Sequence, residues 1–318
     1  MNELTEPIKK AFVVHHNADA DGRLSGYIAC EYYKEQGFEV VPIGWDYHYD
    51  PSNLFLLLKE QREGERHIKE CYQDVIVITD ISLPKSSMEA LHYISPSFND
   101  VVWIDHHKSA IEELEVLGFT GIREVGVAAC ELAWKFFYPN EDIPIAIKLA
   151  GQYDVWKKDG EYSWWVKVIP FQFFLKGQDL DIASQRGREM CQWLCDTDEN
   201  EPDFENWMDL GNKLVEAETE RCKKLSFFRT KFEGVDFTVL NGMGSSTVFE
   251  FAEKTGQALM CFWFNSNNVV MFRMYHGTDK SLDLSSIAKK WGGGGHKGAC
   301  GFHVDQDDGT GIISGDFA

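Results

Sequence analysis

Short apolar runs that alternate with helix-length segments place the strongest constraint on how this chain folds. The apolar runs, each read as a strand, fall at residues 11–16, 38–45, 74–82, 100–107 and, more weakly, 121–127. Helical spacing covers residues 22–36, 53–73, 86–94, 108–117, 128–138 and 143–156. Strands that are apolar almost throughout are typical of a parallel sheet covered on both faces. The sequence therefore predicts an α/β domain with a parallel sheet.

A second pattern of strands and helices begins near residue 235. Two apolar runs, ALMCFWF and VVMFRMY, are joined at NSNN, and a glycine run precedes the closing run GACGFHV. Between the two patterns, the chain is charged and reads as helical from about 174 to 232. We therefore predict one domain over residues 1–195, a helical linker over 196–234, and a smaller α/β domain over 235–318. The active site is expected in the cleft between the two domains.

Composition narrows the class of partner. The formal net charge is −20, with no run of lysines or arginines, which makes long duplex nucleic acid a poor candidate substrate. No apolar run is long enough to span a membrane, and the N-terminus lacks the apolar stretch of a signal peptide. The eight cysteines form no CxxC pair, which argues against disulfides and structural zinc. We expect a cytoplasmic protein.

Acids and histidines follow three of the predicted strands. The first strand leads into His16, Asp19 and Asp21, the third into Asp80, and the fourth into residues 105–107, an Asp-His-His triplet. The carboxyl ends of parallel strands meet at one edge of the sheet, so these side chains are expected to converge. Taken singly, each acid could equally cap a helix or make a turn. Three such strand ends together favour a shared site.

Divalent cations would relieve the repulsion among so many carboxylates. Mixed carboxylate and imidazole donors without thiolate favour Mn²⁺ or a similar octahedral ion over structural zinc. The acids outnumber the needs of one ion, and paired metal ions are a common device for hydrolysing phosphate esters. The residues thus indicate metal-assisted hydrolysis of a phosphoester. Aromatic residues offer rings for base stacking, although packing is their commoner role: Trp45, Tyr47, Phe227 and Phe228.

The chain resembles the DHH phosphoesterase superfamily, named for the triplet at residues 105–107. The motif H-x-x-D-x-D-G occurs at residues 16–22, an acid after an apolar strand occurs at Asp80, and Asp154 in GQYDVW matches the helical acid. Asp142 and Asp159 lie near Asp154 and are alternatives for that match. The C-terminal part, with Gly292–Gly301 (GGGGHKGACG), resembles the associated DHHA1 domain.

The resemblance implies a role for each matched residue. Two Mn²⁺ ions are implied, with Mg²⁺ or Co²⁺ as possible substitutes, and Asp80 would bridge them. His107 is implied to face the substrate phosphate as an acid or electrostatic stabiliser, with Asp105 orienting a histidine. The implied metal ligands are His16, Asp19, Asp21, Asp80, His106 and Asp154.

The glycine run and a nearby arginine point to phosphate. Consecutive glycine amides can form an anion-binding nest, and Arg273 on a preceding strand can give bidentate phosphate contacts. An isolated glycine run would more simply be a flexible turn. In the DHHA1 domain that the chain resembles, such residues hold the distal phosphate or nucleotide of the substrate, which implies this role for Arg273, Gly293, Gly294, Gly295 and His296.

Three hypotheses for function remain open at this point. The first is a manganese-dependent phosphodiesterase that cleaves short oligonucleotides or linear and cyclic dinucleotides. The second is an exopolyphosphatase or a phosphomonoesterase acting on nucleotide 3′-phosphates. The third is a non-catalytic nucleotide-binding protein, against which the complete set of motifs argues. The sequence leaves the oligomeric state open, a homodimer included.

Overall fold

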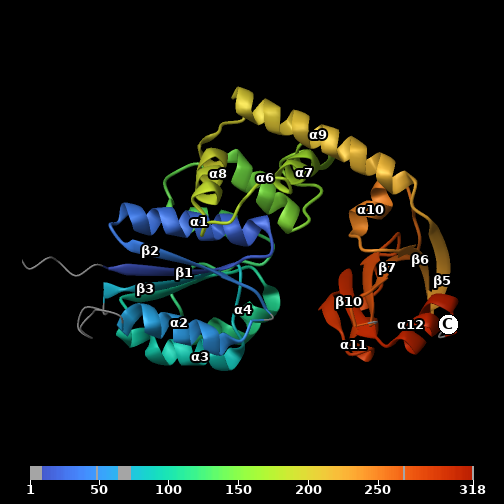
Figure 1. Cartoon of the computed structure of the whole chain (residues 1–318), viewed down its shortest axis with the longest axis horizontal. Coiled ribbons are helices and arrows are strands. Elements are labelled where there is room, and N and C mark those ends of the chain that lie inside the picture. The colour runs from blue at the N-terminus through green and yellow to red at the C-terminus, as the bar shows by residue number, and fades with distance from the viewer. Residues whose placement is uncertain (1–8, 48, 64–72, 268, 317–318) are drawn as a thin grey trace, which may run out of the picture. The chain divides into compact units, whose positions relative to one another are not determined.

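The computed structural model describes residues 9–47, 49–63, 73–267 and 269–316 of the chain. It divides into two compact units, residues 1–212 and 213–318 (Figure 1). The division falls inside a single long helix, α9, which runs from Pro202 to Lys223. We describe each unit by itself.

A four-stranded parallel sheet forms the centre of the first unit. Its strands are β1 (Lys10–His16), β2 (Glu39–Trp45), β3 (Val75–Thr79) and β4 (Asp100–Ile104). They lie in the order β2-β1-β3-β4, with every neighbouring pair parallel. The strand expected at residues 121–127 does not form: Thr120 and Arg123 make only isolated bridges to Val102 and Asp105. Gly121 interrupts the extended backbone. Its φ is +125°, outside the extended region, and a Cβ there would lie 2.1 Å from the carbonyl oxygen of Trp103.

Helices cover both faces of this sheet. Figure 1 shows α1 on one face and α2 and α3 on the other. The predicted helix at 53–73 is described only as far as Glu63, and residues 64–72 lie outside the described part. The helix α7, which follows a π-turn, was not predicted. The helices of the first unit before α9 are α1 (Ala20–Glu35), α2 (Pro51–Glu63), α3 (Lys85–Ile94), α4 (Lys108–Leu114), α5 (Ala129–Phe137), α6 (Ile145–Asp154), α7 (Ile169–Leu175) and α8 (Gln185–Asp196).

The strands of this sheet are buried between layers of helices, as expected for a parallel sheet. All five residues of β3 are buried, so neither face of this strand meets solvent. Phe12, Ile76 and Trp103 pack with Leu54 and Met88 in one cluster between the sheet and the α2–α3 layer. Burying each large side chain of this kind contributes roughly 1.5–3 kcal/mol, so the apolar strands hold the strand ends in fixed positions.

The second unit contains a mixed six-stranded sheet. Its order is β5-β6-β7-β8-β10-β9, with β6 and β7 parallel and the other neighbours antiparallel. One face packs against α11 and α12 through Phe237, Phe272 and Phe302. The elements are β5 (Phe227–Phe232), β6 (Val235–Asn241), α10 (Ser246–Phe251), β7 (Ala258–Phe264), β8 (Val270–His276), α11 (Leu284–Lys290), β9 (Gly294–His296), β10 (Ala299–Val304) and α12 (Gln306–Ser314).

The structure corrects the prediction that residues 196–234 are helical throughout. Helix α9 occupies much of that stretch, but Phe227–Phe232 is a strand of the second sheet. Thr230 and Phe232 are buried while their neighbours face out, and both Glu233 and Gly234 have positive φ, as a tight hairpin turn requires. The alternation and the Glu-Gly pair were signals of a hairpin. Helix α12 and strand β9 were also missed.

The observed architecture otherwise confirms the predicted fold class. A parallel α/β domain is followed by a smaller domain with its own sheet and helices. None of the described helices combines the length and apolar character needed to cross a bilayer.

Candidate active site

The predicted strand ends meet at the carboxyl edge of the parallel sheet. The chain leaves β1 towards β2 on one side, while β3 lies on its other side, so the sheet order reverses between β1 and β3. Ligands of open α/β sheets bind at such a switch point. His16 ends β1 and Asp80 follows β3, and His16 Nδ1 lies 3.3 Å from Asp80 Oδ2. His106, after β4, places Nε2 at 3.2 Å from Asp80 Oδ1.

Asp80 occupies the centre of the site in an unusual backbone conformation. Its φ is +58°, in the left-handed region that a non-glycine residue rarely adopts. Its amide donates to the carbonyl of Ile104 at 2.9 Å, which ties it to the end of β4. Its side chain is buried, and Oδ1 lies 3.2 Å from His106 Nε2 and 3.9 Å from His107 Nδ1 without a well-aligned hydrogen bond to a described residue. A buried carboxylate oxygen in this position can accept a cation.

Three groups of donor atoms gather around this edge, each within a span of 4.8 Å. One contains His16, Asp19 and Asp80, another Asp21, His106 and Asp154, and the third Asp80 with both histidines of the triplet. The residues implied as ligands by the resemblance are therefore brought together. This donor set, with the buried carboxylate of Asp80 at its centre, fits a divalent metal ion.

Asp154 enters the site as the last residue of α6. Its Oδ2 lies 3.4 Å from His106 Nε2. The alternatives weighed for this position, Asp142 and Asp159, are exposed and belong to none of the three donor groups. The helix thus delivers one acid to the sheet edge.

Asp19 and Asp21 combine a place in the site with a second role as helix caps. Asp19 is the N-cap of α1, and its Oδ1 accepts from the Gly22 amide at 3.0 Å. Asp21 accepts from the amides of Ala129 and Cys130, at 2.9 and 2.7 Å, at the start of α5. Asp19 and Asp21 can therefore both cap a helix and offer an oxygen to a metal ion. Gly22 is required because a Cβ there would lie 2.2 Å from the carbonyl oxygen of His16.

The two histidines of the triplet diverge, as strand geometry requires. His106 turns its Nε2 to Asp80 and Asp154, whereas His107 Nδ1 lies 2.7 Å from Asp105 Oδ1. The same oxygen of Asp105 accepts from the amides of His106 and His107 at 2.7 and 3.0 Å. Asp105 is fully buried, and its carboxylate contacts the ring of His107. His107 itself is partly exposed, with Asp80 Oδ1 at 3.9 Å.

Without a metal ion, several acids and histidines of the site hold their protons more tightly than usual. Burial opposes the charge on His16, but hydrogen bonds to Asp19 and Asp80 outweigh it and raise the His16 pKa to about 10. Burial, together with the charge of Asp80, raises the pKa of Asp154 to about 7 and moves the pKa of Asp21 well upward. Acids and imidazoles that share protons in this way must release them when a cation binds.

His15 lies next to the site without belonging to it. Its ring is buried against Gly26, where a Cβ would come within 2.7 Å of the His15 side chain. Burial lowers the His15 pKa to about 4, so the ring stays neutral under ordinary conditions. It serves the packing of α1 on β1.

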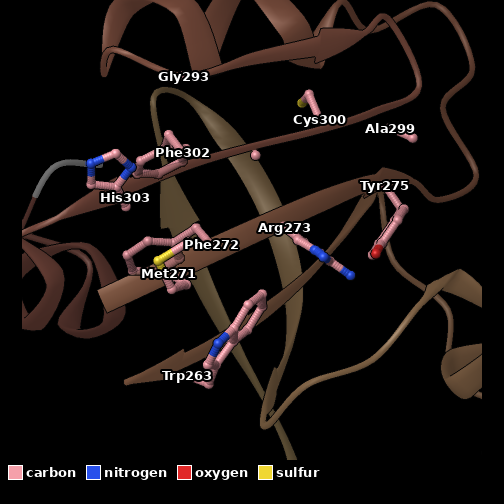
Figure 2. A pocket seen from close by; sticks show the side chains of 11 residues that line it. Trp263, Met271, Phe272, Arg273, Tyr275, Gly293, Ala299, Cys300, Phe302 and His303 are labelled. Atoms are coloured by element: carbon pink, nitrogen blue, oxygen red, sulfur yellow. The ribbon is translucent and has the colours of Figure 1, made fainter. Parts of the chain in front are cut away.

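The second unit has a pocket of about 400 Å³ on the face of its sheet opposite α11. Figure 2 shows Arg273 in this pocket with Trp263 and Tyr275 beside it. The Arg273 guanidinium lies 5.3 Å from the Trp263 ring centre, and the Tyr275 hydroxyl donates to the Gly244 carbonyl at 3.0 Å. Arg273 is exposed and makes no ion pair with a described residue. It is thus available to an anion.

The glycine run is more ordered than a loop. Gly292 has φ of +75°, and its amide and that of Gly293 donate to carbonyls at the end of α11, at 3.1 and 2.8 Å. These two amides therefore end a helix and are not available to a phosphate. Gly294 and Gly295 belong to the edge strand β9, and Gly293 lines the pocket of Arg273. The side chain of His296 lies outside the part of the chain that the structure describes.

Tyr47 is a residue of the site that motif reasoning did not include. Its ring centre lies 5.6 Å from that of His16 and 6.3 Å from that of His107. Its place directly after β2, the one strand without a motif, was the available signal.

A parallel sheet whose switch point holds overlapping sets of carboxylate and imidazole donors is an arrangement that suits metal-assisted hydrolysis of phosphoesters. Residues 10–153 match the model of the DHH family, N-terminal domain. This match agrees with the predicted resemblance: residues 10–153 are similar to the N-terminal domain of the DHH family. None of the curated proteins matches the chain significantly.

Solved structures are similar over nearly the whole chain. The DHH domain of a member of a family of ribosomal proteins has a TM-score of 0.63 and 14% identity, over 97% of this chain and 85% of that one. This likeness shows a shared fold. A pGpG-specific phosphodiesterase from Vibrio has a TM-score of 0.48 and 11% identity, over 96% of each chain. RecJ from Thermus thermophilus, in complex with Mn²⁺, has a TM-score of 0.46 and 12% identity, over 96% of this chain and 51% of that one.

Proposed function

We propose that this protein is a manganese-dependent phosphodiesterase that hydrolyses short oligonucleotides or dinucleotides, linear or cyclic. The observation that carries the proposal is the overlap of the donor groups at Asp80, whose two oxygens face His16 on one side and His106 on the other. A carboxylate placed in this way can bridge two ions. Bound ions would activate a water molecule and neutralise charge on the departing oxygen.

The proposed division of ligands follows the contacts. His16, Asp19 and Asp80 would hold one ion, and Asp21, Asp80, His106 and Asp154 the other. The absence of thiolate from both sets favours Mn²⁺, with Mg²⁺ or Co²⁺ as substitutes. Cys130, which contacts Asp21, does so through its backbone amide.

His107 is proposed to act on the substrate. In hydrolysis, a water oxygen bonds to phosphorus and the bond from phosphorus to the departing ribose oxygen breaks. His107 is partly exposed and its Nδ1 is occupied by Asp105, which leaves Nε2 to donate a proton to that oxygen. Burial opposes protonation, but the hydrogen bond and charge of Asp105 raise the pKa of His107 in the metal-free protein, as a proton donor requires.

The second unit is proposed to bind a phosphate or nucleotide through Arg273. The guanidinium is exposed, is stacked on Trp263 and lies in a pocket wide enough for a small ligand. Gly301, opposite Arg273 on β10, leaves room because it has no side chain. The net charge of −20 supports a short substrate in place of long duplex nucleic acid.

A substrate panel tests the proposal. Protein loaded with Mn²⁺ is incubated with pApA, cyclic di-AMP, short RNA, short DNA, 3′-phosphoadenosine phosphate and polyphosphate, and products are separated by chromatography. Cleavage of an internal phosphodiester bond is expected, and the same preparation treated with chelator serves as the control. Release of phosphate only from polyphosphate or from the 3′-phosphorylated nucleotide would replace the proposal with the second hypothesis. No reaction with any substrate would refute it.

A further inference from the structure

A second pocket, also of about 400 Å³, opens in the first unit directly beside His107. Three stretches of chain form it, and each follows a different strand of the parallel sheet. Tyr47 and Tyr49 come after β2, Ser82 and Lys85 after β3, and His107 after β4. The pocket thus lies beyond the carboxyl ends of the strands, at the same edge as the metal-binding side chains.

The pocket has an apolar floor and an aromatic rim. Trp45, Leu83 and Leu114 form part of the lining and are buried in the core of the unit. Tyr47 and Tyr49 are instead 55% and 47% exposed, which is unusual for two large rings so close together. The Tyr49 ring packs edge-on against Trp45, with centres 5.4 Å apart. Rigid rings over an apolar floor are typical of sites that accept a flat ligand.

Tyr47 connects this pocket to the reacting groups. Its ring meets the rings of His16 and His107 edge-on, at centre distances of 5.6 and 6.3 Å. A ligand moiety lying on Tyr47 would therefore be attached within a few bonds of any phosphate held at His107.

The charge of the pocket argues against a chain of phosphates as occupant. Among the described residues of the lining, Lys85 is the one cationic side chain apart from His107, and Glu113 contributes an opposite charge. Polyphosphate recognition would call for several cations, whereas an uncharged aromatic ring gains from stacking and from the hydroxyls of Ser82 and Ser109.

We propose that this pocket is a nucleobase subsite, in which Tyr47 stacks on the base of a nucleotide whose phosphate lies at the metal site. The inference rests on the proposed phosphodiesterase function and adds to it the place where a base next to the scissile bond is held. Stacking on a tyrosine tolerates every base, so the subsite distinguishes nucleotides from other phosphate esters more than one base from another.

Abasic substrates provide the test. We would measure kcat/KM for pApA and for two analogues, each with one of its adenines replaced by hydrogen, using wild-type protein and Tyr47→Ala. The wild type is expected to cleave one analogue about 10- to 100-fold less efficiently than pApA, from the usual strength of base stacking. For Tyr47→Ala, kcat/KM should fall by a similar factor with pApA, but should fall little further with that analogue. Tyr47→Phe, which keeps the ring, should retain the preference.

Tyr93→Ala is the matched control, because Tyr93 is 85% exposed on α3 and does not line the pocket. It should behave as wild type on all three substrates. If Tyr47→Ala lowers the cleavage of all three equally, the ring supports the histidines and the subsite is wrong, although the phosphodiesterase function stands. The same conclusion follows if the wild type cleaves pApA and both analogues equally well.

A binding experiment separates this inference from the proposed function. If the wild type cleaves none of the three substrates, the phosphodiesterase proposal fails on this panel, and calorimetry with AMP and ribose 5-phosphate decides the subsite. Tighter binding of AMP by about tenfold or more, lost in Tyr47→Ala and kept in Tyr47→Phe, would support it. Equal binding of the two probes would overturn it.

Discussion

The two units offer a phosphate opposite kinds of site. In the first, seven acids and histidines lie at one sheet edge, two of the acids are buried, and the central one, Asp80, has a left-handed backbone conformation. In the second, a single exposed arginine lies on a regular strand beside uncharged rings. Groups that must hold metal ions and act on a bond need burial and fixed geometry, which cost stability. Recognition of charge alone needs neither.

The largest effect is expected at the centre of the first site. Asp80→Ala removes the carboxylate common to two donor groups, so metal content should fall and activity should drop by about 10³-fold or more. Metal analysis and rate measurement on the same sample check this. Asp159→Ala, which changes an exposed acid outside the donor groups, is the control. Full metal content in Asp80→Ala would show that the ions bind elsewhere.

His107 separates chemistry from metal binding within that site. His107→Ala should lower kcat by roughly 10²- to 10⁴-fold, the usual contribution of a general acid, while the metal content stays unchanged. Asp105→Asn should lower kcat less, because the ring remains and its partner keeps an acceptor oxygen but loses the negative charge. His92→Ala, an exposed histidine on α3, should have no effect. Loss of an ion from His107→Ala would make this histidine a ligand.

Arg273 tests the contrast from the other unit. Arg273→Ala should raise KM by about 10- to 100-fold, from the loss of charge-assisted hydrogen bonds, with a much smaller change in kcat. Steady-state kinetics on the cleaved substrate measure both constants. Arg229→Ala removes an exposed arginine from β5 and is the matched control. A fall in kcat alone would mean that the second site takes part in the chemistry.

The smallest effect concerns pH. The raised pKa values of His16 and Asp154 mean that the metal-free site holds protons near neutral pH, and an incoming ion must displace them. Metal affinity should therefore rise with pH, by about tenfold per pH unit for each proton released. Calorimetric titration with Mn²⁺ in buffers of different ionisation enthalpy counts these protons. Arg273→Ala should leave the count unchanged, and an affinity independent of pH would contradict the electrostatics described.

The convergence of these side chains was largely predictable because most of them follow short apolar strands. Runs such as that before Asp80 identify buried parallel strands, and parallel strands place their ends together whatever lies between them in the sequence. The roles of Asp21 as a cap of α5 and of Gly292 as the end of α11 could not be predicted, because each depends on a distant or opposing backbone.

The error at residues 227–232 arose because charged residues made a strand resemble part of a helix. In β5, Arg229 and Lys231 face outward between buried residues, so the segment looked like a continuation of the charged helical region. The sequence offers Tyr47 as a stacking ring, but the structure is needed to show that Tyr47, after β2, lies against His16 and His107.

At Asp80, the backbone conformation that is best for stability and the side chain needed for metal binding favour different residues. Glycine would occupy a φ of +58° with less strain, but it would remove the carboxylate that two of the three donor groups share. Selection for thermal stability alone would thus pull this position away from aspartate, by a preference of roughly 1 kcal/mol. In a library of variants of the chain, sorting for stability should enrich glycine at residue 80, whereas sorting for activity should enrich aspartate. This difference in residue frequencies would show that Asp80 lowers stability but is needed for function.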